Sequence, residues 1–352
     1  MEKVLMKGNE AIAEAAIMAG CRHFFGYPIT PQTELAAYMA RRMPKLGGTY
    51  LQAESEIAAI NMVIGASAAG VRTMTSSSSP GVALKSEGLS YLAGCDLPAV
   101  IVNVQRGGPG LGGIQPSQAD YFMATRGGGH GDFHMIVLAP NSVQEMLDST
   151  IRAFDLADKY RMTVMLLADG ILGQMMEPVQ LTINNEQLTI EKPWATTGTR
   201  GLRPRNVVNS LYLQPEDLET KNVERYARYA EVERVVAGAE LYRAEDADIV
   251  IVAYGACARV AKNAVDAARR DGVAAGLIRP TSLWPFPKAI LAKAAERAGA
   301  FISVEMSMGQ MIEDVALAIR CRRPVSLCSR TGGMVPTPEQ ILDSIRKAGE
   351  SL

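Results

Sequence analysis

Residues 49–60 have the sequence Thr49-Tyr50-Leu51-Gln52-Ala53-Glu54-Ser55-Glu56-Ile57-Ala58-Ala59-Ile60. The stretch begins with a short strand pattern and continues as an alanine-rich helical pattern through Ala68. Glu54 and Glu56 stand at the change, where the first turn of a helix has unpaired backbone N–H groups. Acidic residues favour a helix N-terminus in any protein, so this stretch alone is explained without a functional site. Three further junctions in the N-terminal part of the chain favour a functional interpretation.

Length and composition exclude several classes of protein. The chain has 352 residues, enough for two domains or one large one, and it is 48% hydrophobic and 21% charged. Lys plus Arg number 36 against 37 Asp plus Glu, and this balance argues against a nucleic-acid-binding surface. No apolar run approaches the roughly 18 residues of a membrane span, and the N-terminal residues lack the apolar core of a signal peptide. We therefore expect a cytoplasmic protein that binds neither nucleic acid nor membrane.

Cysteines and histidines give no sign of a metal site. The five cysteines are scattered and form no C-x-x-C pair, so we expect neither an iron–sulfur cluster nor a zinc site in this chain. The chain has three histidines, but no G-x-S-x-G motif, which argues against a serine hydrolase.

The first of the three junctions follows the short strand that begins at Phe24. It includes Pro28 and Pro31, which fix backbone angles and predict extended geometry at Ile29 and Thr30. We expect a helix to begin at Pro31 with Thr30 as its N-cap. The same arrangement would hold the Thr30 hydroxyl at the carboxyl end of a strand, where open α/β sheets bind ligands.

The second junction is rich in serine. It reads Ser76-Ser77-Ser78-Ser79-Pro80-Gly81, after a strand at residues 72–75 and before a helix expected from Val82 to Ala93. Four serines before Pro-Gly are typical of a flexible surface loop, but they also fit a polar pocket at a helix N-terminus. The sequence leaves both interpretations open.

The third junction follows a strongly apolar strand at residues 99–105. It reads Arg106-Gly107-Gly108-Pro109-Gly110-Leu111-Gly112-Gly113, which formally contains G-x-G-x-x-G. A proline lies inside the loop and no acidic residue ends a strand some 20 residues later, so a dinucleotide site is disfavoured. A glycine loop that lets the backbone approach a ligand, with Arg106 supplying a cation, fits better.

Strand and helix patterns alternate along the rest of the chain. The alternation predicts a doubly wound parallel sheet with the polar junctions at the same ends of its strands. We expect a first domain over residues 1–185, a connector over 186–240 with a charged helix near Val223–Val236, and a smaller α/β domain over 241–352. Within the last domain we expect a turn at Arg279–Pro287.

Together these residues resemble the α subunits of 2-oxoacid:ferredoxin oxidoreductases. The resemblance covers essentially the whole chain. It is most specific at Tyr27-Pro28-Ile29-Thr30-Pro31, Glu54-Ser55-Glu56, Ser79-Pro80-Gly81 and Arg106-Gly107-Gly108-Pro109-Gly110-Leu111-Gly112, and it includes Arg279–Pro287 and Arg330–Met334. It implies a pyrimidine-binding domain for thiamine diphosphate, followed by a domain like the C-terminal domain of transketolase.

The resemblance also implies roles for individual residues. Glu56 falls on the family's conserved glutamate, which hydrogen-bonds the pyrimidine ring and favours the imino tautomer that removes the thiazolium proton. Thr30 falls on the threonine that contacts the oxo-acid group, and Arg106 on the arginine that faces the substrate carboxylate. Further cofactor contacts are expected from Pro28, Ile29 and Ser79. Glu54 is interpreted as a helix-terminus residue only.

Part of the expected cofactor site is missing from the chain. Thiamine enzymes hold the diphosphate and its Mg²⁺ through a Gly-Asp-Gly motif, and the nearest stretch here, His130-Gly131-Asp132-Phe133, departs from it. The resemblance therefore implies a β subunit that binds thiamine diphosphate and Mg²⁺, a γ subunit, and a ferredoxin-like δ subunit. The [4Fe-4S] clusters would lie on these partners, coenzyme A would accept the acyl group, and this chain would be inactive alone.

The sequence is most similar to the branched-chain members, which use 2-oxoisovalerate (3-methyl-2-oxobutanoate). Members specific for 2-oxoglutarate carry Ser-Thr-Gly where this chain has Gly110-Leu111-Gly112. Apolar side chains such as Leu111 and Ile114 would suit an isopropyl tail, while 2-oxoglutarate and pyruvate remain alternatives. Two other classes also remain: a nucleotide- or acyl-group-binding transferase, and a non-catalytic assembly subunit.

Overall fold

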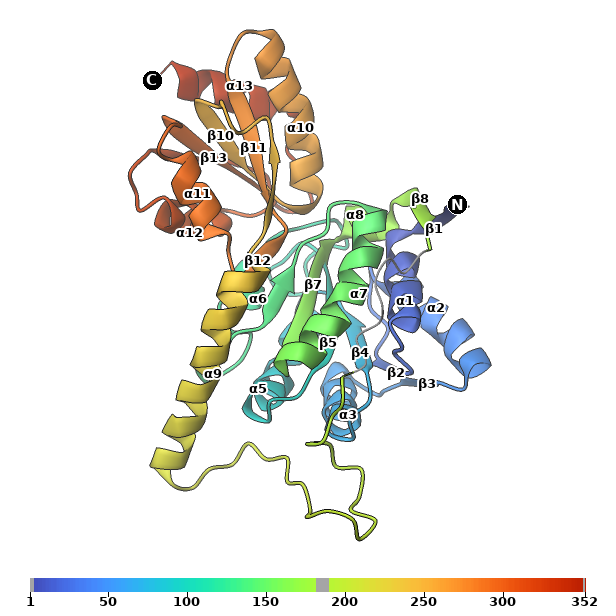
Figure 1. Cartoon of the computed structure of the whole chain (residues 1–352). Coiled ribbons are helices and arrows are strands. Elements are labelled where there is room, and N and C mark those ends of the chain that lie inside the picture. Colours follow the sequence, from blue (N-terminus) through green and yellow to red (C-terminus); the bar gives the residue numbers. More distant parts are fainter. Residues whose placement is uncertain (1–2, 182–189, 351) are drawn as a thin grey trace.

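The computed structural model describes residues 3–181, 190–350 and 352. The long helix α9 (Pro215–Val236) runs alongside the N-terminal α/β unit, which is the larger, and the C-terminal α/β unit lies beyond one end of this helix (Figure 1). The expected boundary between residues 185 and 186 lies outside the described residues.

The N-terminal unit is built on a seven-stranded sheet. In sheet order its strands are β12 (Ser282–Trp284), β6 (Ile136–Leu138), β7 (Thr163–Asp169), β5 (Ala99–Gln105), β4 (Thr73–Ser77), β2 (His23–Gly26) and β3 (Thr49–Gln52). All neighbours from β6 to β3 pair in parallel, and β4, β5 and β7 are buried along their whole length. Strands covered on both faces require continuous runs of apolar or small residues, which is why the sequence predicted this sheet correctly.

Two groups of helices pack on this sheet. One group contains α1 (Gly8–Met18), α7 (Val143–Tyr160) and α8 (Gly170–Gln174), and α2 (Thr33–Arg42) packs against α1. The other contains α3 (Glu56–Ala68) and α5 (Ser86–Gly94). Two short helices, α4 (Ser79–Ala83) and α6 (Tyr121–Thr125), follow the junctions after β4 and β5, and a 3-10 turn covers Met43–Leu46. A separate pair of antiparallel strands joins β1 (Lys3–Lys7) to β8 (Met176–Gln180).

The C-terminal unit has a five-stranded sheet of its own. Its strands, in sheet order, are β14 (Val325–Ser329), β13 (Ala300–Glu305), β10 (Ile249–Val252), β11 (Ala275–Pro280) and β9 (Ala239–Tyr242). Only β9 among them runs antiparallel to its neighbour. Helix α10 (Gly255–Arg270) packs on α13 (Pro338–Gly349), and α11 (Lys288–Ala294) packs on α12 (Met311–Ala318). The parallel α/β architecture is therefore confirmed in both units.

Three expectations about elements were wrong. The segment expected as a turn contains β12, which leaves the second unit and pairs antiparallel with β6 of the first sheet. The helix expected from Val82 to Ala93 is divided into α4 and α5, because Lys85 turns its side chain inward. The connector helix begins at Pro215 rather than near Val223, since proline is well suited to the first helical turn.

Candidate active site

The four junctions singled out in the sequence lie at one edge of the first sheet. Thr30, Glu56, Ser79 and Arg106 follow the carboxyl ends of β2, β3, β4 and β5, which are neighbours in the order β5-β4-β2-β3. Parallel neighbouring strands bring their carboxyl ends to the same edge, so four loops distant in sequence form one site.

Glu56 is the first residue of α3, and its side chain is directed into the protein. The Ser55 hydroxyl caps the helix by accepting a hydrogen bond from the Ala58 N–H (3.1 Å). Glu56 is only 6% exposed, whereas Glu54 is exposed and lies outside the helix. A carboxylate used only to favour a helix N-terminus would remain in water, so the burial of Glu56 indicates a further role.

The Glu56 carboxylate lies directly beside Gly81. A Cβ atom at Gly81 would lie 2.1 Å from Ser77 Oγ and 2.6 Å from Glu56 Oε1, both far inside van der Waals contact. The hydroxyl and the carboxylate therefore converge over a glycine that no larger residue can replace without a shift. The absence of a side chain here lets the Ser77 hydroxyl and the Glu56 carboxylate approach the backbone closely.

Several buried polar atoms at this edge have no hydrogen-bond partner among the described residues. They include the hydroxyls of Ser77 and Ser78, whose residues are both 0% exposed, and Nε of Arg106. A buried donor or acceptor without a partner costs free energy, so such atoms in one place indicate a polar ligand. Of the two interpretations of the serine junction, the flexible surface loop is therefore wrong, because the serines are buried, and the polar pocket stays a prediction.

Arg106 and Thr30 are brought together, although not through the threonine hydroxyl. The guanidinium of Arg106 donates from Nη1 to the Thr30 carbonyl and from Nη2 to the Leu111 carbonyl, both at 3.0 Å. Arg106 is 7% exposed, so this cation is held in a fixed place under its own loop. Thr30 is exposed, and its expected role as a helix N-cap was wrong.

The loop before α2 explains that error. The helix starts at Thr33 with Gln32 at the N-cap position, and no side chain caps it. Gln32 is instead used in tertiary contacts, because its Nε2 donates to the Tyr27 carbonyl (3.3 Å) and its Oε1 accepts from Ser76 Oγ (2.6 Å). Pro28 is exposed and Ile29 half-buried in the same loop, and their contact with the cofactor stays a prediction.

Ser79 fixes the start of the Arg106 loop through hydrogen bonds. Its hydroxyl donates to Asp120 Oδ2 (2.6 Å) and accepts from the Arg106 N–H (3.0 Å), while Asn103 Nδ2 also donates to Asp120 Oδ2 (2.9 Å). Burial raises the pKa of Asp120, and the hydrogen bonds from Ser79 and Asn103 oppose that rise. Sequence reasoning missed Asp120 and Asn103, and the cofactor contact predicted for Ser79 remains untested.

Lys85 is a second residue that the sequence did not indicate. Its side chain is 0% exposed and donates to Thr75 Oγ1 (2.8 Å) and to the Ser76 carbonyl (3.2 Å). Burial lowers the pKa of Lys85 to about 7, and the charge of Glu56 acts in the opposite direction. A lysine is almost never fully buried, and this one lies behind the candidate site.

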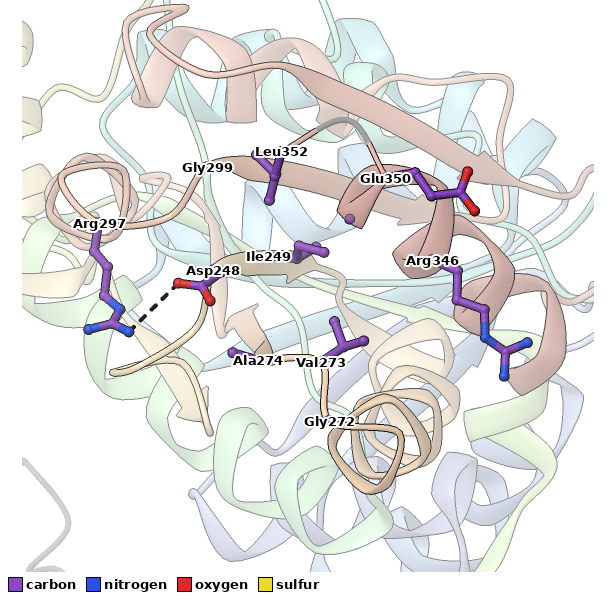
Figure 2. Close-up of a pocket in the computed structure, with 11 residues that line it drawn as sticks. Asp248, Ile249, Gly272, Val273, Ala274, Arg297, Gly299, Arg346, Glu350 and Leu352 are labelled. Carbon is purple, nitrogen blue, oxygen red and sulfur yellow. Dashed lines mark ion pairs between the residues drawn. The ribbon is translucent and has the colours of Figure 1, made fainter.

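A hollow of about 720 Å³ lies far from these residues, in the C-terminal unit (Figure 2). Its lining includes Asp248, Ala274 and Gly299, which directly precede β10, β11 and β13. It is therefore at the amino ends of a parallel sheet, the end opposite to the one at which such sheets bind ligands. Among the described residues, no three His, Cys, Asp or Glu side chains are grouped to hold a metal ion. None of the described helices is long and apolar enough to span a membrane.

Comparisons with known proteins agree with this geometry. Residues 14–240 match the family model "Pyruvate flavodoxin/ferredoxin oxidoreductase, thiamine diP-bdg", and residues 247–341 match "Pyruvate:ferredoxin oxidoreductase core domain II". The chain belongs to the 2-oxoacid:ferredoxin oxidoreductase family. It is therefore an enzyme subunit of this family with a thiamine-diphosphate-binding domain, as the resemblance in the sequence implied.

Among its relatives is the ketoisovalerate oxidoreductase subunit VorB of Methanothermobacter marburgensis, 51% identical over 100% of this chain and 99% of that protein. The 2-oxoglutarate synthase subunit KorA of Methanothermobacter thermautotrophicus is 38% identical, over 98% of this chain and 99% of the relative. The resemblance to the branched-chain type is thus confirmed.

Two solved structures share the fold. The 2-oxoglutarate:ferredoxin oxidoreductase of Magnetococcus marinus, solved with 2-oxoglutarate, coenzyme A and succinyl-CoA bound, matches with a TM-score of 0.86 at 30% identity. The match covers 99% of this chain and 65% of that one, so this chain spans about two thirds of its length. A split-gene transketolase in an inactive β4 tetramer matches at a TM-score of 0.61 and 14% identity, over 97% of this chain and 96% of that one, which shows the fold alone.

Proposed function

We propose that this chain carries the pyrimidine-binding half of the active site in a 2-oxoisovalerate:ferredoxin oxidoreductase that depends on thiamine diphosphate. The complex would oxidatively decarboxylate the branched-chain 2-oxo acid to its acyl-CoA and pass the electrons to ferredoxin. The observation that carries the proposal is the buried Glu56 carboxylate, which packs closely against Gly81 beside the Ser77 and Ser78 hydroxyls, for which the described residues offer no hydrogen-bond partner.

The residues at this edge fit the pyrimidine ring of the cofactor. A polar heteroaromatic ring needs hydrogen-bonding groups at its rim, and Gly81 lets the Glu56 carboxylate and the Ser77 hydroxyl lie close together. Glu56 would hydrogen-bond the ring nitrogen, and Ser77 and Ser78 have the free hydroxyls to meet other polar ring atoms. Bound thiamine diphosphate would supply the carbanion that attacks the oxo group and the electron sink that accepts the pair left by CO₂.

Arg106 and Thr30 would serve the substrate side, and Ser79 the cofactor side. Arg106 is a buried cation whose Nε–H has no hydrogen-bond partner among the described residues, and a fixed guanidinium suits a carboxylate, so we assign it to the carboxylate of the oxo acid. Thr30 would place its exposed hydroxyl near the oxo group, while Pro28 and Ile29 line the same loop. Ser79, whose hydroxyl is bound to Asp120 and Arg106, would contact the cofactor through its remaining surface.

The site requires partner subunits. Large apolar side chains at this edge are exposed, including Tyr27, Leu51, Ile57 and Leu84 at 37–53%. Apolar groups gathered around a polar site are typical of a surface that another chain covers. We assign that cover to a β subunit that binds the diphosphate and Mg²⁺, with a γ subunit and a ferredoxin-like δ subunit carrying [4Fe-4S] clusters. We place the assembly in the cytoplasm.

The substrate assignment rests on the relatives and on one loop. The ketoisovalerate oxidoreductase subunits are 51% and 48% identical to this chain, and the 2-oxoglutarate synthase subunits 36–38%. Leu111 and Ile114 are 83% and 59% exposed, so they form no closed pocket in the isolated chain. We infer that the pocket for the isopropyl tail closes over them only in the complex.

The test is coenzyme-A-dependent reduction of a viologen dye by the complex purified through this chain. 2-Oxoisovalerate, 2-oxoglutarate and pyruvate are compared side by side, with Glu56→Gln as the variant. We expect the highest kcat/KM with 2-oxoisovalerate and a loss of at least about a hundredfold in the variant, because an amide cannot replace the acid–base role. Preference for another oxo acid would overturn the substrate assignment, and a fully active Glu56→Gln complex would overturn the mechanism.

A further inference from the structure

The loop Arg330–Met334 follows β14 in the C-terminal unit and lies against the base of the Arg106 loop (residues 106–116). A Cβ atom at Gly333 would lie 2.4 Å from Cβ and 3.0 Å from Cγ of Gln115. A Cβ atom at Gly107 would lie 3.6 Å from the Gly333 nitrogen. The backbone at Gly333 therefore packs closely against Gln115 and lies beside Gly107.

These two neighbours of Gly333 close the Arg106 loop at its base. The Gly107 N–H donates to the Gln115 carbonyl (3.0 Å), and Arg106 forms an antiparallel bridge with Pro116. At the tip of the same loop, the Leu111 carbonyl accepts a hydrogen bond from Arg106 Nη2 (3.0 Å). A shift of Gln115 would therefore move the base of the loop, and with it the Arg106 guanidinium and Leu111.

The C-terminal unit also holds the residues that follow this loop. The Gln118 N–H donates to the Met306 carbonyl (3.0 Å), and the Met306 N–H donates to Gln118 Oε1 (3.1 Å). Gln118 Nε2 donates to the carbonyl of Tyr254 (2.9 Å). Met306 and Tyr254 follow β13 and β10, so the carboxyl ends of β10, β13 and β14 all face this part of the first unit. This is the edge at which parallel sheets bind ligands.

We propose that the Arg330–Met334 loop of the C-terminal unit positions the substrate side of the site, with Gly333 as the positioning residue that sets the Arg106 loop through Gln115. Gly333 touches neither substrate nor cofactor. The inference rests on the proposed function, because it requires Arg106 to bind the carboxylate of the oxo acid. It gives the C-terminal unit a part in substrate binding in addition to packing.

The direction of the effect follows from the close approach at Gly333. In Gly333→Ala the added methyl group displaces Gln115, and the Arg106 guanidinium moves away from the substrate carboxylate. The carboxylate is present in the ground state and in the transition state, so its weaker binding raises KM more than it lowers kcat. A loop that only joined the two units would instead reduce the amount of folded enzyme, which lowers kcat and leaves KM in place.

The first experiment measures KM and kcat for 2-oxoisovalerate in complexes purified through this chain. We expect Gly333→Ala to raise KM by about tenfold and to change kcat by less than about threefold. Gly272→Ala is the matched control, because its φ of +83° is close to the +93° of Gly333 and its Cβ would meet nothing within 4 Å. It shares the backbone strain of alanine at positive φ without the collision, and its KM should stay within about twofold of wild type. An unchanged KM in Gly333→Ala, or an equal rise in Gly272→Ala, would overturn the proposal.

A compensating variant tests whether the collision with Gln115 is the cause. Gln115→Gly removes the Cβ and Cγ atoms that the new methyl group would strike. In the double variant, KM should therefore equal that of Gln115→Gly alone. If the two single effects on KM multiply in the double variant, Gly333 does not act through Gln115 and the proposal fails.

Hydrogen exchange separates this inference from the proposed function. The N–H groups of Gly107 and Gly113 donate within the loop, to Gln115 and Gly107, so their exchange reports whether the loop is closed. In the complex and in the full chain alone, residues 106–116 should exchange at least about tenfold faster in Gly333→Ala and as in wild type in Gly272→Ala. Unchanged exchange in Gly333→Ala would overturn the inference even where no activity is measured. A wild-type complex without any 2-oxo acid activity would reject the proposed function, whereas an active Gly333→Ala complex with faster exchange and unchanged KM would reject this inference alone.

Discussion

At the scale of single residues, the site is defined by an absent side chain as much as by those present. Ser77 Oγ and Glu56 Oε1 lie 2.1 and 2.6 Å from the position of a Cβ that Gly81 lacks, so these two atoms pack directly against the glycine. Any side chain here would have to displace a buried carboxylate or a buried hydroxyl. Gly81 is therefore required by close approach and not by backbone angle, since its φ is not positive.

Gly81→Ala should reduce cofactor binding and turnover by at least about tenfold, because the added methyl group displaces the Glu56 carboxylate or the Ser77 hydroxyl. Gly65→Ala is the control, since its Cβ would meet nothing within 4 Å on the exposed side of α3. That control should keep full activity and gain about 0.5–1 kcal/mol in the free energy of unfolding. Calorimetric titration of thiamine diphosphate and the dye assay check both, and equal behaviour of the two variants would reject this account of Gly81.

Lys85 makes the stability of the chain depend on pH. Burial lowers its pKa to about 7, whereas the unfolded chain returns it to about 10.5. Between these values the unfolded state binds more protons, so stability rises with pH through this window. The free-energy cost of burying the protonated Lys85 amino group is absent above about pH 10.5 and reaches its full value below about pH 7. In urea unfolding at pH 7, 8 and 9, the free energy of unfolding of the wild type should rise relative to that of Lys85→Met by on the order of 1 kcal/mol per pH unit. If the two free energies of unfolding change in parallel with pH, this prediction is wrong.

The sequence identified some site residues and not others, for a physical reason. Thr30 and Arg106 stand in loops rich in proline or glycine, whose composition is itself a signal of a junction, and Glu56 stands where a strand pattern changes to a helical one. Lys85 and Asp120 stand where nothing in the neighbouring residues marks them. Whether a charged side chain turns inward depends on partners distant in sequence, and local patterns carry no information about those partners.

At the scale of elements, the ends of β4 and β5 are joined by one small polar cluster. Ser79 contacts both Asp120 and the backbone of Arg106, and Asn103 contacts Asp120 and the Ser79 N–H. This cluster fixes the start of the Arg106 loop relative to α4. The sequence predicted β4 and β5 from their apolar runs. It did not predict the cluster, because the cluster depends on how these two parallel strands align.

Ser79→Ala removes the hydroxyl that donates to a partly buried carboxylate. We expect the free energy of unfolding to fall by about 1–3 kcal/mol, and KM for the oxo acid to rise as the Arg106 loop loosens. Ser86→Ala is the control, because the Ser86 hydroxyl makes an exposed contact with the Ala83 carbonyl. Its removal should change the free energy of unfolding by less than about 0.5 kcal/mol. A rise in KM of the same size in both variants would show that the cluster does not position the loop.

At the scale of the whole molecule, the two α/β units are joined through shared elements. β12 belongs to the first sheet although it follows β11 of the second, and Trp284 on β12 stacks on His134 with ring centroids 4.6 Å apart. The division at residues 240 and 241 stays a proposal, and β9 spans it. The sequence predicted a second α/β unit from its apolar strands, but not the crossing of β12, because three residues carry no pattern that selects a partner sheet.

Arg279 makes a buried, charged contact between the units. It is 3% exposed and donates to both carboxylate oxygens of Glu145 on α7 (2.8 and 2.9 Å) and to Glu240 on β9 (2.7 Å). Its two partners are about a third exposed, so solvent screens part of the interaction. Removing the guanidinium nevertheless leaves two carboxylates facing each other at the junction.

Arg279→Met should therefore lower the free energy of unfolding by about 2–3 kcal/mol, less than the loss for a fully buried pair. Because the contact couples the units, calorimetry of the isolated chain should also show the single unfolding transition broaden or separate into two. Arg346→Met tests the alternative that any lost arginine has this effect, since Arg346 pairs with Asp271 and Asp343 on the surface of the C-terminal unit alone. Arg279→Met could instead unfold in a single sharp transition with the same midpoint as the Arg346→Met control. That result would mean that the packing of β12 and α9 holds the units together without this contact.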